Sequence, residues 1–127
     1  MNTPVQFPDW SDKKILIAED LDGNFAVLSA LLKLTKVQLL RAFNGQEAIA
    51  LMSQYKDVNV ILMDISMPEM DGIEALRQIR QQMPHKIVIA QTAHAFSKVI
   101  ADEEFDDYLQ KPIRRNTLIE LLSKYLS

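Results

Sequence analysis

Asp64 is the residue whose type and position first suggest chemistry. It follows the mainly apolar run 58–63 and precedes a loop that contains Pro68 and ends at Gly72. An apolar run bounded by proline and glycine is typical of a strand buried on both faces, so Asp64 should lie at the carboxyl end of that strand. Open α/β sheets bind their ligands at this edge. Asp64 therefore stands where a reactive acid is expected.

Other polar side chains follow apolar runs in the same way. If the runs are neighbouring parallel strands, these side chains share one edge of the sheet with Asp64. They are Glu19 and Asp20 after 14–18, Thr92 after 86–90, and Lys111 after 108–109.

This combination of side chains predicts phosphoryl chemistry assisted by a metal ion. Clustered carboxylates repel one another unless a cation lies among them, and hard oxygen ligands suit Mg²⁺. With Mg²⁺ bound, Asp64 would attack a phosphoryl donor and form an aspartyl phosphate. Lys111 would offset charge on the transferring oxygens. The Thr92 hydroxyl and nearby backbone N–H groups would donate to the bound phosphoryl group.

Each of these residues also has a simpler interpretation. An acid at a strand end is often a helix cap or part of a solvated turn, which would account for Asp64 or for the pair Glu19 and Asp20. Thr92 could bond its own backbone, and Lys111 could be an ordinary solvated lysine. Their coincidence at four strand ends favours the functional interpretation.

Strands and helices are expected to alternate along the chain. Runs rich in apolar and β-branched residues predict strands at 14–18, 37–43, 58–63, 86–90 and 108–109. Helical spacing of apolar residues predicts helices at 24–34, after Gly45, from Gly72 to near Pro84, and over 118–125. The helical signal is weak between 93 and 107. This order predicts a parallel sheet covered on both faces.

Composition limits the class of protein. A chain of 127 residues with 48% hydrophobic and 24% charged residues fits one domain, which we expect over 14–127, after a linker-like arm at 1–13. The net charge of −3, without a dense Lys/Arg cluster, argues against direct nucleic-acid binding. The chain has no cysteine, no basic and apolar leader and no run long enough to span a bilayer, so we expect no membrane contact and a cytoplasmic location.

The motifs together resemble the receiver domain of response regulators, the phosphoacceptor module of two-component signalling. The matching segments are 15–20, 62–72, Thr92-Ala93 and 107–112. The resemblance covers 14–126 and implies a doubly wound (βα)5 flavodoxin-like domain with five parallel strands in the order 2-1-3-4-5. It also implies a cis peptide bond between Lys111 and Pro112.

By the same resemblance, the site residues take specific roles. Asp64 would be the phosphoacceptor, and Mg²⁺ would be held by Asp64, Asp20, the Ser66 carbonyl and, through water, Glu19. Thr92, Lys111 and the backbone of Ile65 and Ala93 would hold the phosphoryl group. Tyr108 would change rotamer when Thr92 moves inward, which alters a surface for a partner.

The resemblance also implies a setting. The phosphodonor would be a histidine kinase or a histidine phosphotransfer domain, and the arm favours the terminal receiver of a hybrid kinase over a stand-alone receiver. The domain alone would not be a turnover enzyme, and it would be a monomer or a weak dimer. The interval from Thr92 to Lys111 is short for the family, which predicts a shortened fourth helix.

The sequence argues against two other functions and leaves a third open. An aspartate-based phosphatase would need a second acid two residues after Asp64, where Ser66 stands. A flavodoxin-like cofactor binder would need a phosphate-binding loop where Glu19 and Asp20 stand. The alternative we retain is a pseudo-receiver, which acts as an interaction module without phosphorylation.

Overall fold

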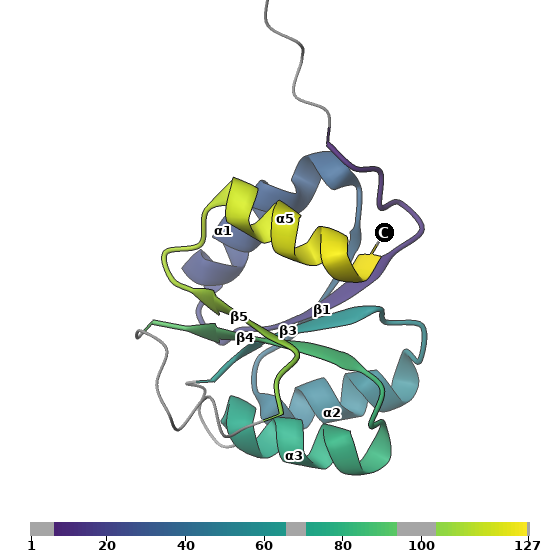
Figure 1. Ribbon diagram of the computed structural model, residues 1–127. Helices are drawn as coiled ribbons and strands as arrows, with labels where there is room; N and C mark the ends of the chain where they lie inside the picture. The colour runs from purple at the N-terminus through teal and green to yellow at the C-terminus, as the bar shows by residue number, and fades with distance from the viewer. Residues whose placement is uncertain (1–6, 66–70, 94–103, 127) are drawn as a thin grey trace, which may run out of the picture.

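Five parallel strands form one sheet at the centre of the structure, a computed structural model that describes residues 7–65, 71–93 and 104–126 (Figure 1). The strand order β2-β1-β3-β4-β5 confirms the predicted fold class and topology. The strands are β1 (Lys14–Ala18), β2 (Gln38–Ala42), β3 (Val60–Asp64), β4 (Ile87–Thr92) and β5 (Asp107–Gln110).

Helices cover both faces of this sheet. Helices α1 (Asp22–Leu32) and α5 (Arg115–Leu126) lie on one face, and α2 (Gly45–Gln54) and α3 (Gly72–Gln82) lie on the other (Figure 1). A short 3₁₀ turn, η1 (Lys33–Thr35), follows α1. The predicted shortened fourth helix falls within 94–103, outside the described residues. No described helix has the length and apolar character needed to cross a membrane.

Two apolar clusters, one on each face, hold the helices to the sheet. Alternate residues of a strand point to opposite faces, so Leu16 and Ile61 pack under α2 and α3, whereas Ile17 and Leu62 pack under α1 and α5. All four side chains are fully buried. Burial on both faces explains why the central strands are continuous apolar runs in the sequence.

Strand register aligns the carboxyl ends of the strands. In the ladders, Ala18 pairs with Met63, Asp64 with Gln91 and Thr92 with Gln110. Glu19, Asp64, Thr92 and Lys111 therefore emerge at the same edge, as the sequence predicts.

The helices that begin at this edge differ in how they are capped. The Asn44 side chain accepts a hydrogen bond from the Glu47 N–H at the start of α2, at 2.8 Å, and Asp71 accepts one from the Glu74 N–H at the start of α3, at 2.9 Å. Helix α1 has Leu21 at its N-cap, which makes no side-chain cap. The first N–H groups of a helix lack partners within it, so those of α1 bond to water or to other groups.

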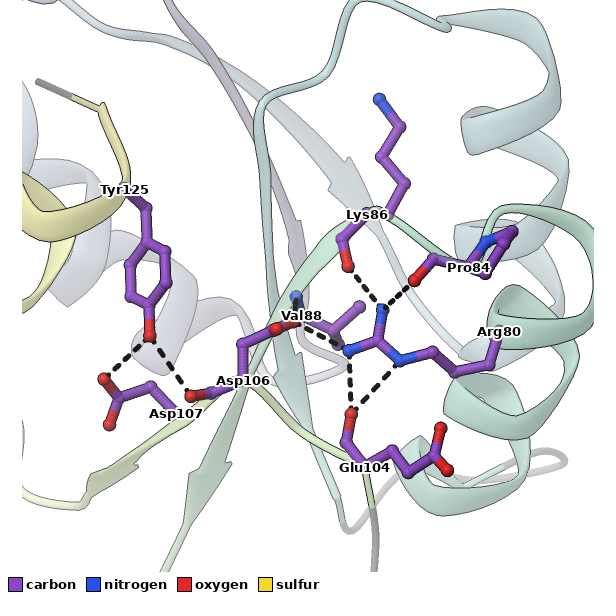
Figure 2. A network of polar contacts seen from close by, with 8 residues as sticks. All are labelled: Arg80, Pro84, Lys86, Val88, Glu104, Asp106, Asp107 and Tyr125. Atoms are coloured by element: carbon purple, nitrogen blue, oxygen red, sulfur yellow. Dashed lines mark hydrogen bonds and ion pairs between the residues drawn. The ribbon is translucent and has the colours of Figure 1, made fainter.

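A polar network fastens β4 and β5 at the opposite edge of the sheet (Figure 2). Arg80 of α3 donates to the Asp106 carboxylate and to the backbone carbonyls of Glu104 and Lys86. The Tyr125 hydroxyl of α5 donates to the Asp107 carboxylate at 3.0 Å. The start of β5 and the segment before it are thus tied to helices on both faces.

Part of the N-terminal arm packs onto the domain. Trp10 is 3% exposed and belongs to the cluster under α1 and α5. Its backbone N–H donates to the Thr35 carbonyl at 2.7 Å. The Arg115 guanidinium lies over the Phe7 ring, 5.7 Å from its centroid. The arm is therefore in contact with the domain from Phe7 onward.

Candidate functional site

Three carboxylates gather at the carboxyl edge of the sheet. One oxygen from each of Glu19, Asp20 and Asp64 lies within 4.8 Å of the others. Asp64 is the last residue of β3, and Glu19 and Asp20 directly follow β1. Glu19 is fully buried and Asp64 is 5% exposed. The structure therefore brings together three of the four predicted metal ligands; the fourth, Ser66, lies outside the described residues.

Lys111 joins two of these acids. Its ammonium Nζ lies 3.0 Å from Glu19 Oε1 and 3.0 Å from Asp64 Oδ2. The peptide bond between Lys111 and Pro112 is cis, as predicted, and the Lys111 N–H donates to the Thr92 carbonyl at 2.8 Å. The backbone at the end of β5 thus places the lysine over the end of β3.

Burial and charge shift the protonation equilibria of this cluster. Burial raises the pKa of the Glu19 carboxyl, the hydrogen bond from Lys111 opposes the rise, and the negative charge of Asp64 adds to it. Burial acts to lower the pKa of Lys111, but its hydrogen bonds to Asp64 and Glu19 outweigh burial, so its pKa is raised. The raised pKa of Lys111 favours its protonated form, which faces the Asp64 and Glu19 carboxyl groups.

The donor set fits a hard divalent cation. Three carboxylates within reach of one another offer oxygen ligands and excess negative charge, which Mg²⁺ prefers, and the partial exposure of Asp20 leaves room for water ligands. When bound, Mg²⁺ would supply charge stabilisation for the oxygens of a transferring phosphoryl group.

Thr92 and Tyr108, the predicted switch pair, lie on adjacent strands. Tyr108 pairs with Ala90, two residues before Thr92, so the side chains of Thr92 and Tyr108 project to the same face of the sheet. Thr92 is 3% exposed, whereas Tyr108 is half-buried with its ring edge to face against Phe105, at 5.9 Å between centroids. Their positions are compatible with the predicted coupling, which stays a prediction.

The two predicted backbone donors differ in their surroundings. The Ile65 N–H donates to the Gln91 carbonyl at 3.2 Å as a continuation of the sheet, so a phosphoryl oxygen would have to share it. Ala93 is exposed directly after β4. Their role in holding a phosphoryl group also stays a prediction.

Two polar residues near the site were not anticipated from the sequence. Arg41 on β2 donates to the Glu19 carbonyl at 3.1 Å, and the Gln91 side chain is fully buried on β4. A charged or amide side chain inside an otherwise apolar strand was the available signal, since such a side chain is costly without a specific partner.

Comparison with known proteins identifies the family. The sequence matches the family described as response regulator receiver domain over residues 15–123. The chain is 31% identical over 122 residues to hybrid signal transduction histidine kinase L of Dictyostelium discoideum, covering 88% of this chain and 7% of that protein. It thus spans a small part of this relative.

Solved structures agree with this assignment. One is the receiver domain of the response regulator Ssk1 in complex with the histidine phosphotransfer protein Ypd1 of Saccharomyces cerevisiae, with a TM-score of 0.83, 28% identity, and coverage of 96% of this chain and 92% of that one. Another is the receiver domain of the sensor histidine kinase PA1611 of Pseudomonas aeruginosa PAO1, with a magnesium ion coordinated in its active-site cleft. Its TM-score is 0.83 at 29% identity, and the match covers 90% of this chain and 97% of that one. The chain belongs to the receiver domains of response regulators, the modules of two-component signalling.

Proposed function

We propose that this receiver domain takes a phosphoryl group from a phosphohistidine onto Asp64 in a Mg²⁺-dependent reaction. The observation that carries the proposal is the contact of one ammonium, that of Lys111, with both Asp64 and Glu19 inside a cluster of three acids. A lysine held over a strand-end aspartate beside a cation site provides the parts that phosphoryl transfer to a carboxylate requires.

The chain's own groups have distinct tasks in this reaction. A carboxylate oxygen of Asp64 attacks phosphorus, and an O–P bond forms while the N–P bond of the phosphohistidine breaks, leaving its electron pair on the imidazole. Lys111 faces the negative charge that the phosphoryl oxygens bring. The Thr92 hydroxyl, at the end of the neighbouring strand, donates to one of these oxygens. Glu19, Asp20 and Asp64 would hold the magnesium ion.

The added charge drives the switch. A phosphoryl group adds negative charge and acceptor oxygens, which favour an arrangement with Thr92 drawn toward Asp64 and Tyr108 in the space beside it. The readout is a changed surface near β5 and α5 for a partner protein. We propose that the domain itself is not a turnover enzyme and is a monomer or a weak dimer.

We propose a histidine kinase or a histidine phosphotransfer domain as the phosphodonor, and a cytoplasmic setting. Two comparisons support this choice of partner: the Ssk1 receiver was crystallised with the phosphotransfer protein Ypd1, and hybrid signal transduction histidine kinase L contains a matching segment. Placement of this domain at the end of a hybrid kinase is likewise a proposal.

Intact-mass analysis after incubation with acetyl phosphate tests the function. Wild type should gain one phosphoryl group with Mg²⁺ and none with EDTA, and Asp64→Asn should gain none. Asp57→Asn is the matched control, because this exposed carboxylate lies at the other edge of the sheet, where it pairs with Lys14 at 2.8 Å. A wild type that gains no phosphoryl group would instead support the pseudo-receiver.

A further inference from the structure

Arg41 lies beside the proposed metal site in an unusually confined position. It pairs with Ile17 in the sheet, and its guanidinium carbon lies 4.0 Å from the centroid of the Phe43 ring and 4.8 Å from that of the Phe25 ring. The side chain is 17% exposed. An arginine whose guanidinium lies over two aromatic rings has less freedom to reorient, since its planar group interacts favourably with both.

The guanidinium contacts the chain on both sides of Asp20. Its Nε donates to the carbonyl of Glu19 at 3.1 Å, and its Nη1 lies 2.8 Å from Asp22 Oδ1. Asp20 stands between these two anchored residues. The third nitrogen, Nη2, is buried with no hydrogen-bond partner among the described residues, so the hold on the loop depends on Nε and Nη1.

This loop has few other attachments in the described structure. Helix α1 starts without a side-chain cap, whereas α2 and α3 have Asn44 and Asp71. The loop's other contacts include the Glu19 N–H with the Ala42 carbonyl at 2.9 Å, the Leu21 N–H with Glu19 Oε2 at 3.3 Å, and Lys111 Nζ with Glu19 Oε1 at 3.0 Å. The contacts with Glu19 Oε1 and Oε2 use the carboxylate of a proposed metal ligand, and the bond to Ala42 holds the loop only before Asp20. Arg41 holds the loop on both sides of Asp20 without using a ligand's carboxylate.

We propose that Arg41 is a positioning residue for the metal site, holding the loop that carries Asp20 in the geometry that a magnesium ion requires. The inference rests on the proposed function, because it assumes Mg²⁺ binding at Glu19, Asp20 and Asp64. Without this anchor, repulsion among these acids would push the loop away from Asp64. Because Mg²⁺ requires near-ideal octahedral geometry, such a shift would weaken its binding.

Charge and position predict opposite effects, which makes the inference testable. Arg41 is a cation near a cation site, so on Coulomb grounds alone Arg41→Met would tighten Mg²⁺ binding. If Arg41 acts by position, the same variant weakens it. Arg41→Lys keeps the charge but cannot reproduce the planar fork or the stacking. Charge alone therefore predicts no change for Arg41→Lys, and positioning predicts weaker binding.

The experiment is a Mg²⁺ titration of the metal-free protein, followed by calorimetry or amide chemical shifts, with urea unfolding in EDTA as a second readout. Residues that orient metal ligands change affinity by about 10-fold to 100-fold, so we expect the Mg²⁺ dissociation constant to rise about 10-fold in Arg41→Met and by part of that in Arg41→Lys.

Lys14→Met is the matched control. Lys14 also lies on the sheet, pairs with Asp57 at 2.8 Å and lies over the Tyr55 ring, but at the opposite edge. Lys14→Met should lose about as much stability in urea as Arg41→Met, but its Mg²⁺ affinity should equal that of wild type. Unchanged or tighter Mg²⁺ binding in folded Arg41→Met would overturn this inference and leave the proposed function standing. If Arg41→Met does not fold, the Mg²⁺ affinity of Arg41→Lys decides. A wild type that binds no Mg²⁺ overturns the proposed function as well.

Discussion

The Arg80 guanidinium of α3 and the Asp106 carboxylate next to β5 form an ion pair, with 2.7 Å between Nη2 and Oδ2. The same carboxylate oxygen accepts the Val88 N–H at 2.8 Å, and Arg80 also donates to the Glu104 carbonyl at 2.7 Å and 3.1 Å (Figure 2). One arginine therefore links α3, β4 and the segment that leads into β5. This arrangement fixes the beginning of β5. Lys111, which belongs to the site, follows the other end of the same strand.

Arg80→Met should destabilise the domain substantially. The side chain is 14% exposed, and its loss removes the ion pair with Asp106 and the donor to the Glu104 and Lys86 carbonyls. Hydrogen bonds to charged groups contribute about 1.5–3 kcal/mol, so we expect the free energy of unfolding in urea to fall by about 2 kcal/mol or more. Arg80→Lys should recover only part of this, because lysine lacks the fork.

Arg114→Met provides the comparison for Arg80. Arg114 is exposed on the loop before α5, and such surface changes are usually within about 0.5 kcal/mol. Equal losses of stability in the two variants would contradict the structural importance assigned to Arg80.

The sequence predicts the sheet and the acid cluster because both depend on local patterns. Buried strands are continuous apolar runs, and residues that follow parallel strands share an edge. Arg80 was not anticipated, because its partners lie 24 and 26 residues away in the chain and only tertiary packing brings them to it. The direct contact between Lys111 and Glu19 was not predicted either. It depends on how far the lysine at the end of β5 reaches across β4 and β3 toward the end of β1, which apolar periodicity does not determine.

Gly72 occupies a position where a larger residue would disturb the site. A Cβ on Gly72 would lie 2.5 Å from the Asp64 carbonyl oxygen and 2.8 Å from the Cα of Ile65, so the backbone after Asp64 would have to move. Gly72→Ala should lower the free energy of unfolding by about 1–3 kcal/mol, as overpacking does, and slow phosphorylation of Asp64 by acetyl phosphate.

Gly23→Ala is the matched substitution for Gly72→Ala. A Cβ on Gly23 in α1 meets nothing within 4 Å. Alanine is favoured over glycine in a helix by about 1 kcal/mol, so this variant should be neutral or more stable in the same urea titration. If Gly72→Ala behaves like Gly23→Ala, the close approach of α3 to β3 is not a constraint.

Gln91 is a buried amide whose replacement should stabilise the protein. Its side-chain oxygen and nitrogen have no hydrogen-bond partner among the described residues, and it lines a cavity of about 140 Å³ between α1 and the loop after β5. An unsatisfied buried polar group costs about 1–3 kcal/mol, so Gln91→Leu should raise the free energy of unfolding by an amount in this range. Gln110→Leu, exposed on β5, should change it little. Destabilisation by Gln91→Leu would mean that the cavity holds water bound to the amide.

Trp10 tests how far the N-terminal arm contributes to the fold. Removing a buried tryptophan side chain costs about 3–5 kcal/mol, so Trp10→Ala should lower the midpoint of urea unfolding markedly. Phe7→Ala, which removes a contact with the Arg115 side chain at 5.7 Å, should have a much smaller effect. Equal midpoints for wild type and Trp10→Ala would indicate that residues before Lys14 act as a linker alone.

Tyr125 should make stability depend on pH in the alkaline range. Burial raises the pKa of Tyr125 to about 12, and its hydrogen bond to Asp107 and the charges of Asp107 and Asp106 act in the same direction. The fold thus favours the protonated phenol. Its contribution is fully present below the unfolded value of about 10 and is lost as pH rises through about 12. The stability difference between wild type and Tyr125→Phe should therefore shrink between these pH values. Urea unfolding of both variants measures it, because shared effects such as lysine deprotonation cancel in the difference. A constant difference across this range would show that folding does not raise the pKa of Tyr125.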